Sequence, residues 1–425
     1  MLTALEQGVK GGVWFSLIDK VWSPANLESA WARVKANDGA AGVDHVTVAM
    51  FERHLGTNLR GLSEQLRAGT YRPQAVRRVF IPKAGGGERP LGIPTVRDRV
   101  LQTALRHVLE PIFERDFARH SYGFRPGRGC KDALRRVDEL LKAGYTHVVD
   151  ADLKGYFDSI PHDRLMERVR EKVADGRVLK LVEALLTQGV MEGLSRWTPT
   201  AGSPQGAVVS PLLSNVYLGP LDHLMARRGW EMVRYADDFV ILSRSAEEAA
   251  RALEEVRQWT AQAGLTLHPD KTRIAVLGPG SPLKAGEGFE FLGYRFERSE
   301  EGRLCRRPRD KSLAKLKDAI RAKTRRTSGH SLGHVIASVN PTVRGWFGYF
   351  KHASRAARRR PDTFARLDQW VRMRLRSILR KRLRLPGCGR GKDHQRWPNK
   401  FFAARGLFSM DTAHALLRQS APSLR

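Results

Sequence analysis

Two short apolar runs in the middle of the chain enclose a polar corner. Residues 233–242 read Val-Arg-Tyr-Ala-Asp-Asp-Phe-Val-Ile-Leu, with β-branched and aromatic residues on both sides of the acidic pair. Such runs around a tight turn predict a β-hairpin. Asp237 and Asp238 are therefore expected at the tip of a hairpin, where they present two adjacent carboxylates.

A second apolar run, earlier in the chain, also ends in acidic residues. Val148 and Val149 lead into Asp150-Ala151-Asp152. Side chains alternate between the two faces of a strand, so Asp150 and Asp152 are expected to share one face. A strand-end acid beside an acidic hairpin tip can hold two metal ions ~3.5–4 Å apart. The pattern itself does not decide between Asp150 and Asp152.

Apolar residues recur with helical spacing in several longer segments. Leu27, Trp31 and Val34, for example, would form one face of a helix. Two strand-like runs around a Gly-rich turn predict a second hairpin over residues 79–94. Residues 289–296 alternate like a strand. The spacing predicts helices over residues 26–36, 97–110, 246–263, 311–326, 332–352 and 362–384.

The composition adds a strong positive charge to this picture. Of the 425 residues 41% are hydrophobic, which is typical of a globular protein. The formal net charge is +30 at pH 7, and residues 301–400 hold 29 Lys and Arg against 6 Asp and Glu. A charge of this size destabilises a compact chain unless a polyanion balances it, so nucleic acid is the expected partner.

Other classes of protein find little support in the sequence. Cys130, Cys305 and Cys388 are far apart and form no Cys-x-x-Cys pair, so neither a structural zinc site nor a disulfide framework is expected. No apolar run approaches the length of a membrane span, and the N-terminus has no secretory core. We expect a cytoplasmic, nucleoid- or ribonucleoprotein-associated protein without a membrane partner.

The clustered acids favour a magnesium site. Neighbouring carboxylates repel each other unless a cation neutralises them, and Mg²⁺ prefers hard oxygen ligands together with substrate phosphates. An Asp-Asp pair can also simply make a turn or cap a helix, and for the hairpin alone that alternative stays open. Two metal ions held by all these acids would support in-line phosphoryl transfer.

Further blocks in a fixed order connect the acids to a known family. They are the Gly-rich loop 37–44, Ser-Tyr-Gly-Phe-Arg-Pro-Gly-Arg-Gly-Cys at 121–130, the match of 152–162 to Asp-(Ile/Leu)-Lys-x-x-Phe-Asp-x-Ile-x-His, Pro-Gln-Gly at 204–206 and Arg-Gly-Trp-Phe-Gly-Tyr-Phe at 344–350. With these blocks the chain resembles the reverse transcriptases, or maturases, encoded by bacterial group II introns. No Cys/His-rich nuclease segment follows Phe408, so the resemblance is to endonuclease-lacking, group IIC-like members.

The resemblance implies an α+β fold with the right-hand polymerase architecture. Fingers would be followed by an antiparallel palm sheet with helices, a hairpin that grips the primer, and a helical thumb. The implied regions are an N-terminal extension with a template-contacting block (1–75), fingers and palm (76–297), the thumb or maturase domain (298–384) and a short basic DNA-binding segment (385–425).

The resemblance also assigns the candidate site residues. It selects Asp152, with Asp237 and Asp238, as the catalytic acids, and these three with Leu153 would hold two Mg²⁺ ions. The residues implied to bind the nucleotide are Lys83, Arg89, Phe157, Gln205, Gly206 and Lys271. Those implied to contact nucleic acid are Arg125, Arg344, Arg358, Arg359, Arg360, Arg372, Arg376, Arg380 and Arg396.

Several of these residues have two open interpretations. The Phe157 ring would exclude a ribose 2′-OH in the family, but it is also compatible with an ordinary core position. Lys271 is either a general acid for the leaving pyrophosphate or a solvent-exposed lysine. His162 is expected to make a structural hydrogen bond. The helical spacing of Trp346, Tyr349 and Phe350 predicts packing between helices.

The implied function is that of an RNA-directed DNA polymerase of a mobile group II intron. It would extend a DNA primer or target DNA with dNTPs on an RNA template, and bind the intron RNA to assist splicing and retrohoming. Two alternatives stay open. One is a splicing-only RNA-binding maturase, and the other is an intron-derived reverse transcriptase recruited to CRISPR adaptation, phage defence or DNA repair.

Overall fold

The computed structural model describes residue 5 and residues 12–82, 87–193, 195–203, 206–277, 288–298, 302–354, 362–385 and 391–419. The chain forms two compact units, unit 1 at Met1–Ala275 and unit 2 at Val276–Arg425. The division falls ahead of the segment 289–296, which therefore belongs to unit 2.

The N-terminal part of unit 1 is helical. Leu27, Trp31 and Val34 are buried on one face of their helix, as the spacing predicts. Thr95 caps the longest of these helices, because its side chain accepts a hydrogen bond from the Asp98 N–H. The helices are α2 (Ile18–Trp22), α3 (Pro24–Asn37), α4 (Val48–Arg53), α5 (Leu55–Ala68) and α6 (Val96–Glu114).

The first sheet of unit 1 has the strand order β2-β1-β4-β5. Strands β1 (Val76–Pro82) and β2 (Glu88–Ile93) are antiparallel, which confirms the predicted hairpin. Strand β4 (Val190–Glu192) joins β1 in parallel, and β5 (Ser195–Trp197) pairs with β4 in an antiparallel hairpin. We call this sheet the fingers sheet.

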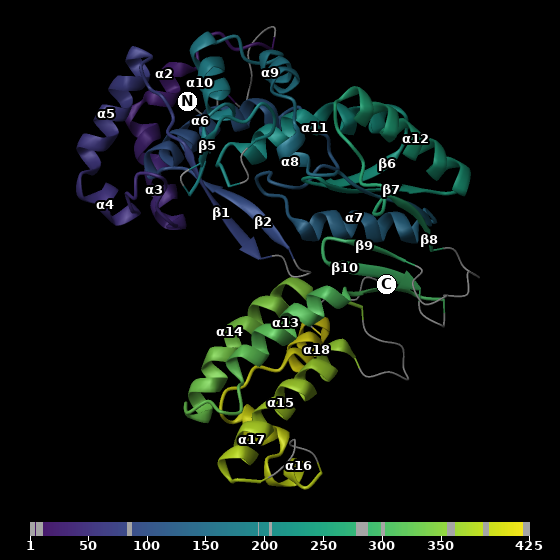
Figure 1. Ribbon diagram of the computed structural model, residues 1–425. Coiled ribbons are helices and arrows are strands. Elements are labelled where there is room, and N and C mark those ends of the chain that lie inside the picture. The colour runs from purple at the N-terminus through teal and green to yellow at the C-terminus, as the bar shows by residue number, and fades with distance from the viewer. Residues whose placement is uncertain are drawn as a thin grey trace. The chain divides into compact units, whose positions relative to one another are not determined.

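The second sheet, the palm sheet, has the order β6-β7-β3-β8. Its strands are β3 (His147–Asp152), β6 (Glu231–Tyr235), β7 (Asp238–Ser243) and β8 (Arg273–Val276). Helices α11 (Ser210–Arg227) and α12 (Ala246–Gln262) lie on one side of the sheet, and α7 (Cys130–Lys142) lies on the other (Figure 1). Both faces are covered, which explains why Phe239 to Leu242 form a continuous apolar run.

Three further helices complete unit 1, and one core joins its parts. They are α8 (Tyr156–Ser159), α9 (His162–Arg170) and α10 (Gly176–Leu186). The buried apolar residues of the N-terminal helices and a part of those of the palm sheet, such as Val149 and Ile241, belong to a single cluster, which extends to Leu265. The palm strands are therefore supported by most of unit 1.

Unit 2 combines a small sheet with helices. Its sheet, ordered β11-β10-β9, is made of β9 (Phe289–Phe291), β10 (Tyr294–Arg298) and β11 (Leu304–Pro308). The alternation at 289–296 is strand-like, and the resemblance implied the primer-gripping hairpin at this segment. Leu292 and Gly293, with φ values of 49° and 77°, form the turn of that hairpin. The helices are α13 (Asp310–Lys323), α14 (Leu332–Phe350), α15 (Thr363–Arg382), α16 (Asp393–Arg396), α17 (Asn399–Ala403) and α18 (Met410–Gln419).

Candidate active site

The palm sheet brings the predicted acids together. In the antiparallel pairing of β3 with β7, Asp152 lies directly opposite Asp238. Strand β6 pairs with β7 so that Tyr235 lies opposite Asp238, which leaves Ala236 and Asp237 as the two residues of the turn. The three acids thus occupy one end of two neighbouring strand pairs. Asp150 lies opposite Val240, further from the turn.

A buried arginine holds this turn in place. Arg234 is fully buried, and its guanidinium donates to both carboxylate oxygens of Asp222, at 2.8 and 2.5 Å. It also donates to the Asn215 Oδ1 atom at 2.9 Å and to the Ala236 carbonyl at 2.8 Å. Burial opposes the charge, but the ion pair with Asp222 keeps the pKa of Arg234 above its ordinary value. Arg234 therefore stays charged and fixes the backbone beside Asp237.

The sequence did not predict this clamp, by which we mean the hydrogen bonds of the Arg234 guanidinium to Asp222, Asn215 and the Ala236 carbonyl. Arg234 stands between Val233 and Tyr235 in an apolar run, and a charged residue at such a position requires a buried partner. That signal indicates a partner but does not identify it, since Asp222 and Asn215 lie on α11 and become neighbours only in the fold.

The turn also packs against the loop before α7. The Tyr122 N–H donates to the Arg234 carbonyl at 2.9 Å, and Asn215 Nδ2 donates to the Gly123 carbonyl at 2.8 Å. A Cβ atom on Gly123 would lie 2.2 Å from the Ala236 nitrogen, so only glycine allows this contact. Ala236 itself has a φ of 60°. The Ser-Tyr-Gly-Phe block thus packs against the main chain of the acidic turn.

The Gly123→Ala variant is expected to lose both stability and DNA synthesis. The new methyl group meets backbone rather than a flexible side chain, so the turn itself must move. We expect a destabilisation of about 1–3 kcal/mol, as for overpacked cores. DNA synthesis should fall about tenfold or more, because misplacement by ~1 Å is already costly. Thermal unfolding and primer extension measure the two effects. Gly129→Ala is the matched control, since Gly129 has a φ of −147° and no atom closer than 3.9 Å.

Basic residues after α12 pair with the acids of β3. Lys271 Nζ lies 2.8 Å from Asp152 Oδ2, and Arg273 Nε lies 3.6 Å from Asp150 Oδ2. The segment is held close by main-chain bonds, since the His268 N–H donates to the Asp152 carbonyl at 2.7 Å. Leu153, the other predicted metal-site residue, forms an isolated bridge with Leu267. Lys271 is therefore close to a predicted catalytic carboxylate, with a side chain that is 58% exposed.

The acids are suited to Mg²⁺ but are not arranged around one point. Across the described ranges, no three His, Cys, Asp or Glu side chains form a group that could hold a metal ion as they stand. The Asp152 carboxylate is turned toward Lys271 and is 41% exposed. Residues directly opposite in an antiparallel pair have Cβ atoms ~4.5–5.5 Å apart, so side-chain rotation can bring Asp152 and Asp238 to one ion. Carboxylate oxygens are also the ligands that Mg²⁺ prefers.

Tyr235 ends β6, directly before the acidic turn. Burial raises the pKa of Tyr235 to about 12, and the neighbouring Cys130 adds to the shift. The phenol therefore stays protonated at neutral pH. It contributes packing beside the acidic turn.

The predicted nucleotide residues are only partly covered by the structure. Lys83 and Gln205 lie outside the described residues, and of Arg89 only the main chain in β2 is described. Phe157 is half-buried against the core and packs edge-on to Phe124, with ring centroids 6.5 Å apart. Gly206 has a φ of 105°, and a Cβ atom there would lie 2.4 Å from the Gly92 carbonyl oxygen.

The loop before Gly206 is fixed to the palm. The Ser203 N–H donates to the Phe157 carbonyl at 2.7 Å, and the Gly202 N–H donates to the Ile160 carbonyl at 2.8 Å. His162 Nε2 lies 2.6 Å from the Gly202 carbonyl oxygen. The structural role predicted for His162 is confirmed by this contact.

Comparison with known proteins identifies the family. A family model described as reverse transcriptase (RNA-dependent DNA polymerase) matches residues 81–296, and a model of the group II intron maturase-specific domain matches residues 313–397. The chain belongs to the group II intron reverse transcriptases. It is accordingly an RNA-directed DNA polymerase with a maturase domain. Reverse transcriptase domains generally use divalent metal ions, and both matched families act on nucleic acid.

Individual relatives align with different shares of this chain. Protein YkfC of Escherichia coli (strain K12) is 35% identical over 332 residues, which are 68% of this chain and 85% of YkfC. Group II intron-encoded protein LtrA of Lactococcus lactis subsp. cremoris is 37% identical over 196 residues, 45% of this chain but only 32% of LtrA. A chain of a partial Cas6-RT-Cas1–Cas2 complex is 25% identical, covers 58% of this chain and 42% of its own, and has a TM-score of 0.38.

Two of the arginines predicted to contact nucleic acid are internal in this reverse transcriptase. Arg125 has a 2% exposed side chain, pairs with Glu114 at 2.7 Å and donates to two main-chain carbonyls. Arg376 is 1% exposed and donates to the Trp397 carbonyl at 3.0 Å and to Asn399 Oδ1 at 3.1 Å. The prediction is corrected for both, because their guanidinium groups are already used inside the protein.

The remaining predicted arginines lie nearer the surface of unit 2. Arg344 is exposed, and its guanidinium carbon lies 4.5 Å from the centroid of the Phe408 ring. Arg396 is exposed beside Trp397, and Arg372 is half-buried. Arg380 is 19% exposed and pairs with the buried Asp393 at 2.6 Å. The positions 358, 359 and 360 lie outside the described residues.

The aromatic residues of the maturase domain pack largely inside it. Phe350 is buried, and the Trp346 ring lies 4.6 Å from it. Tyr349 is 39% exposed, but its hydroxyl donates to the Leu292 carbonyl at 2.8 Å. Trp397 and Phe402 are also buried. The predicted helix-packing role is thus confirmed for Trp346 and Phe350.

Within the described ranges, no helix is both long and apolar enough to cross a membrane.

Proposed function

We propose that this reverse transcriptase copies the RNA of its parent group II intron into DNA at Asp152, Asp237 and Asp238, using dNTPs and a DNA primer. The observation that supports the proposal most is the pairing of Asp152 opposite Asp238, with Asp237 in the adjoining turn. The clamp at Arg234 and the fit of Gly123 against the turn hold the main chain that carries Asp237 in place. A fixed main chain beneath the acids favours the preorganised charge that phosphoryl transfer requires.

The protein residues around the acids have complementary tasks in this proposal. Two Mg²⁺ ions held by the three carboxylates, with the main chain at Leu153, would stabilise the attacking and leaving oxygens. Lys83 and Arg89, from the fingers hairpin, would balance negative charge on the triphosphate. Lys271 already lies 2.8 Å from Asp152 and would move to the phosphates of the nucleotide. Gln205 and Gly206 would line the base pair, and the Phe157 ring would favour a deoxyribose.

We also propose that unit 2 binds the intron RNA and assists splicing and retrohoming. Its partner must be a polyanion, since residues 301–400 alone carry 29 Lys and Arg against 6 Asp and Glu. The candidate phosphate contacts are Arg344, Arg372, Arg396 and the cluster Arg358, Arg359 and Arg360. A cytoplasmic ribonucleoprotein is the setting that this activity requires.

Primer extension in the presence and absence of metal tests the proposal. Purified protein should extend oligo(dT) on poly(rA) with dTTP and Mg²⁺. EDTA should reduce the rate to background, and added Mg²⁺ should restore it, because the clustered carboxylates need a cation. Extension that persists in EDTA would contradict the assignment of the acids. No extension, with tight and salt-sensitive RNA binding, would favour a splicing-only maturase.

A further inference from the structure

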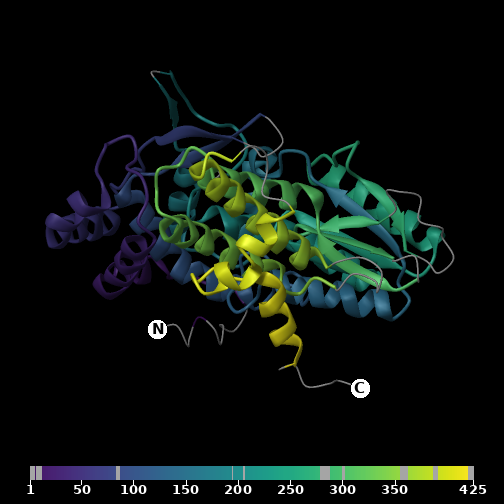
Figure 2. The same cartoon turned by 90° about the horizontal axis from the view of Figure 1, so that it is seen from below.

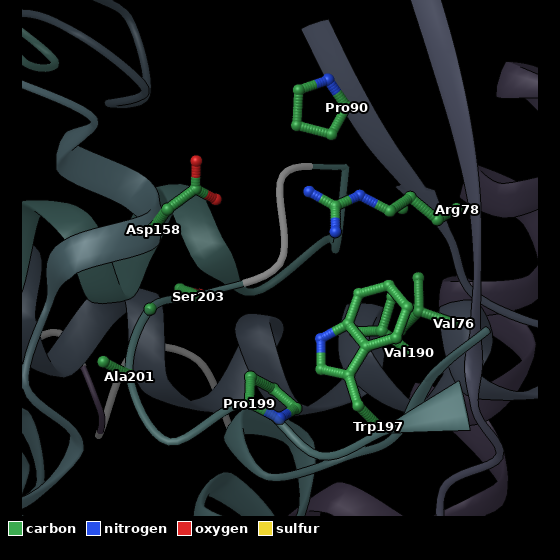
Figure 3. A pocket seen from close by; sticks show the side chains of 11 residues that line it. Val76, Arg78, Pro90, Asp158, Val190, Trp197, Pro199, Ala201 and Ser203 are labelled. Carbon is green, nitrogen blue, oxygen red and sulfur yellow. The ribbon is translucent and has the colours of Figure 1, made fainter. Parts of the chain in front are cut away.

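One face of the fingers sheet carries a row of aligned side chains. Val76 of β1 lies beside Val190 of β4, and Val190 lies opposite Trp197 of β5, so the three share a face. Arg78, two residues along β1, points from the same face and lies opposite Gly92 of β2. Figure 3 shows the Arg78 guanidinium and the Trp197 indole reaching into a common space.

This face borders a pocket of about 210 Å³. Its floor is the sheet face with Arg78 and Trp197, and its opposite wall is formed by Asp158 and the loop Ala201–Ser203 (Figure 3). We call it the Arg78–Trp197 pocket. It is distinct from the surface where the Leu91 side chain meets Gly206, because Leu91 points to the other face of β2.

Hydrogen bonds and close packing tie the wall of the pocket to the palm. Gly202 has a φ of 90°, and a Cβ atom there would lie 2.9 Å from the Asp158 Cα atom. Its N–H bonds to the Ile160 carbonyl, and the neighbouring Ser203 bonds through its main chain to Phe157 and through its hydroxyl to Ser210 at 2.6 Å. A preformed wall of this kind reduces the entropy lost when a ligand binds.

The floor of the pocket combines an exposed ring with a cation. Trp197 is 37% exposed although it is one of the largest apolar side chains. The Arg78 guanidinium lies 5.3 Å from the Trp197 ring centroid and 5.6 Å from that of Phe80. An exposed ring beside an arginine is the surface on which proteins stack single-stranded bases. The β4–β5 hairpin that carries Trp197 projects from the rest of unit 1 (Figure 2, teal), so that a strand of RNA can reach it.

Charge and size narrow the class of ligand. Arg78 lies 3.9 Å from the Glu192 carboxylate, which already balances its charge, and a second carboxylate, Asp158, lies on the facing wall. A phosphate or triphosphate is therefore disfavoured. The volume of about 210 Å³ is below the ~300 Å³ at which pockets for whole drug-sized ligands begin. A flat, uncharged nucleotide base, whose phosphates stay outside the pocket, meets both conditions.

We propose that the Arg78–Trp197 pocket binds an unpaired base of single-stranded RNA, which stacks on Trp197. The proposal rests on the proposed function for its choice of RNA. Two RNAs present the same chemistry: the template strand ahead of the primer terminus, and an unpaired segment of the intron RNA. Binding experiments distinguish the two sources.

The test compares three variants by equilibrium binding in EDTA without dNTP. Trp197→Ala removes the ring, Trp197→Phe keeps a smaller one, and Tyr145→Ala removes a ring that lies beside another arginine, Arg244, outside the pocket. The probes are RNA–DNA duplexes with no overhang or with a six-nucleotide 5′ RNA overhang, and the RNA transcribed from the DNA that surrounds the reading frame. Fluorescence anisotropy gives the dissociation constants.

Trp197→Ala should weaken binding about tenfold for at least one single-stranded RNA, in the range of a lost base–aromatic stack. Trp197→Phe should recover most of the affinity, and Tyr145→Ala should bind like the wild type. A loss confined to the overhang duplex assigns the pocket to the template, and a loss confined to the transcript assigns it to the intron RNA.

Unchanged affinity of Trp197→Ala for all probes would overturn the proposal, as would an equal loss on the duplex without an overhang. A raised KM for dTTP with unchanged RNA binding would also overturn it, in favour of a nucleotide contact. Because these measurements need no catalysis, failure of the wild type to extend a primer would refute the polymerase assignment while leaving the pocket test valid.

Discussion

Replacing Asp237 with asparagine should abolish DNA synthesis while the protein stays folded. The side chain keeps its size but loses its charge, and the turn has other supports in Arg234 and Gly123. Metal ions contribute several kcal/mol of charge stabilisation to phosphoryl transfer, and the remaining two carboxylates would hold them weakly. We expect a loss on the order of 1000-fold or more in the rate of nucleotide addition.

Single-nucleotide extension on an RNA template measures this loss. Asp270→Asn is the matched control, because Asp270 lies in the loop after α12 and its side chain is 89% exposed. The control should polymerise at the wild-type rate. Asp237→Asn should still bind intron RNA and assist splicing, since those contacts are assigned to unit 2. Substantial synthesis by highly purified Asp237→Asn protein would refute the proposed site.

The sequence was sufficient for the parts of this site that depend on local order. The acidic hairpin could be predicted because two short apolar runs and the two-residue turn between them are coded within ten positions. The gap in the strand at Leu292 and Gly293 was also signalled, since a glycine inside an alternating run favours a break. The alternation alone reads as a strand, and the resemblance to the family implied the hairpin that the structure has at this place.

Pairings between distant segments were beyond the reach of the sequence. Arg125 lies in a loop that reads like a nucleic-acid contact, with arginines between aromatic residues. Whether such a guanidinium meets a phosphate or Glu114 depends on how the loop returns to α6, and composition does not encode that. The same holds for Lys271 and Asp152, which are brought together by the pairing of the segment at Leu267 with Leu153.

Replacing Arg234 with methionine is expected to be among the most destabilising changes in the protein. The variant removes one partner of a fully buried ion pair and leaves the Asp222 carboxylate, whose side chain is 4% exposed, without its cation. Breaking such a pair costs about 3–5 kcal/mol. For a unit of this size the midpoint of thermal unfolding should fall on the order of 10 °C. Arg168→Met is the matched control, because the Arg168 and Glu171 side chains are 43% and 54% exposed and exposed pairs contribute at most ~1 kcal/mol.

A double variant separates the effect on folding from the effect on the active site. Arg234→Met with Asp222→Leu replaces both charges by apolar groups, which often restores the stability lost with one partner. The Ala236 carbonyl still lacks its hydrogen bond in this protein, so the turn that carries Asp237 loses its clamp. We therefore expect the double variant to regain most of its thermal stability but to synthesise DNA well below the wild-type rate. Recovery of both properties would show that Arg234 serves the fold alone. Recovery of stability without synthesis would show that the same buried guanidinium also positions the catalytic turn.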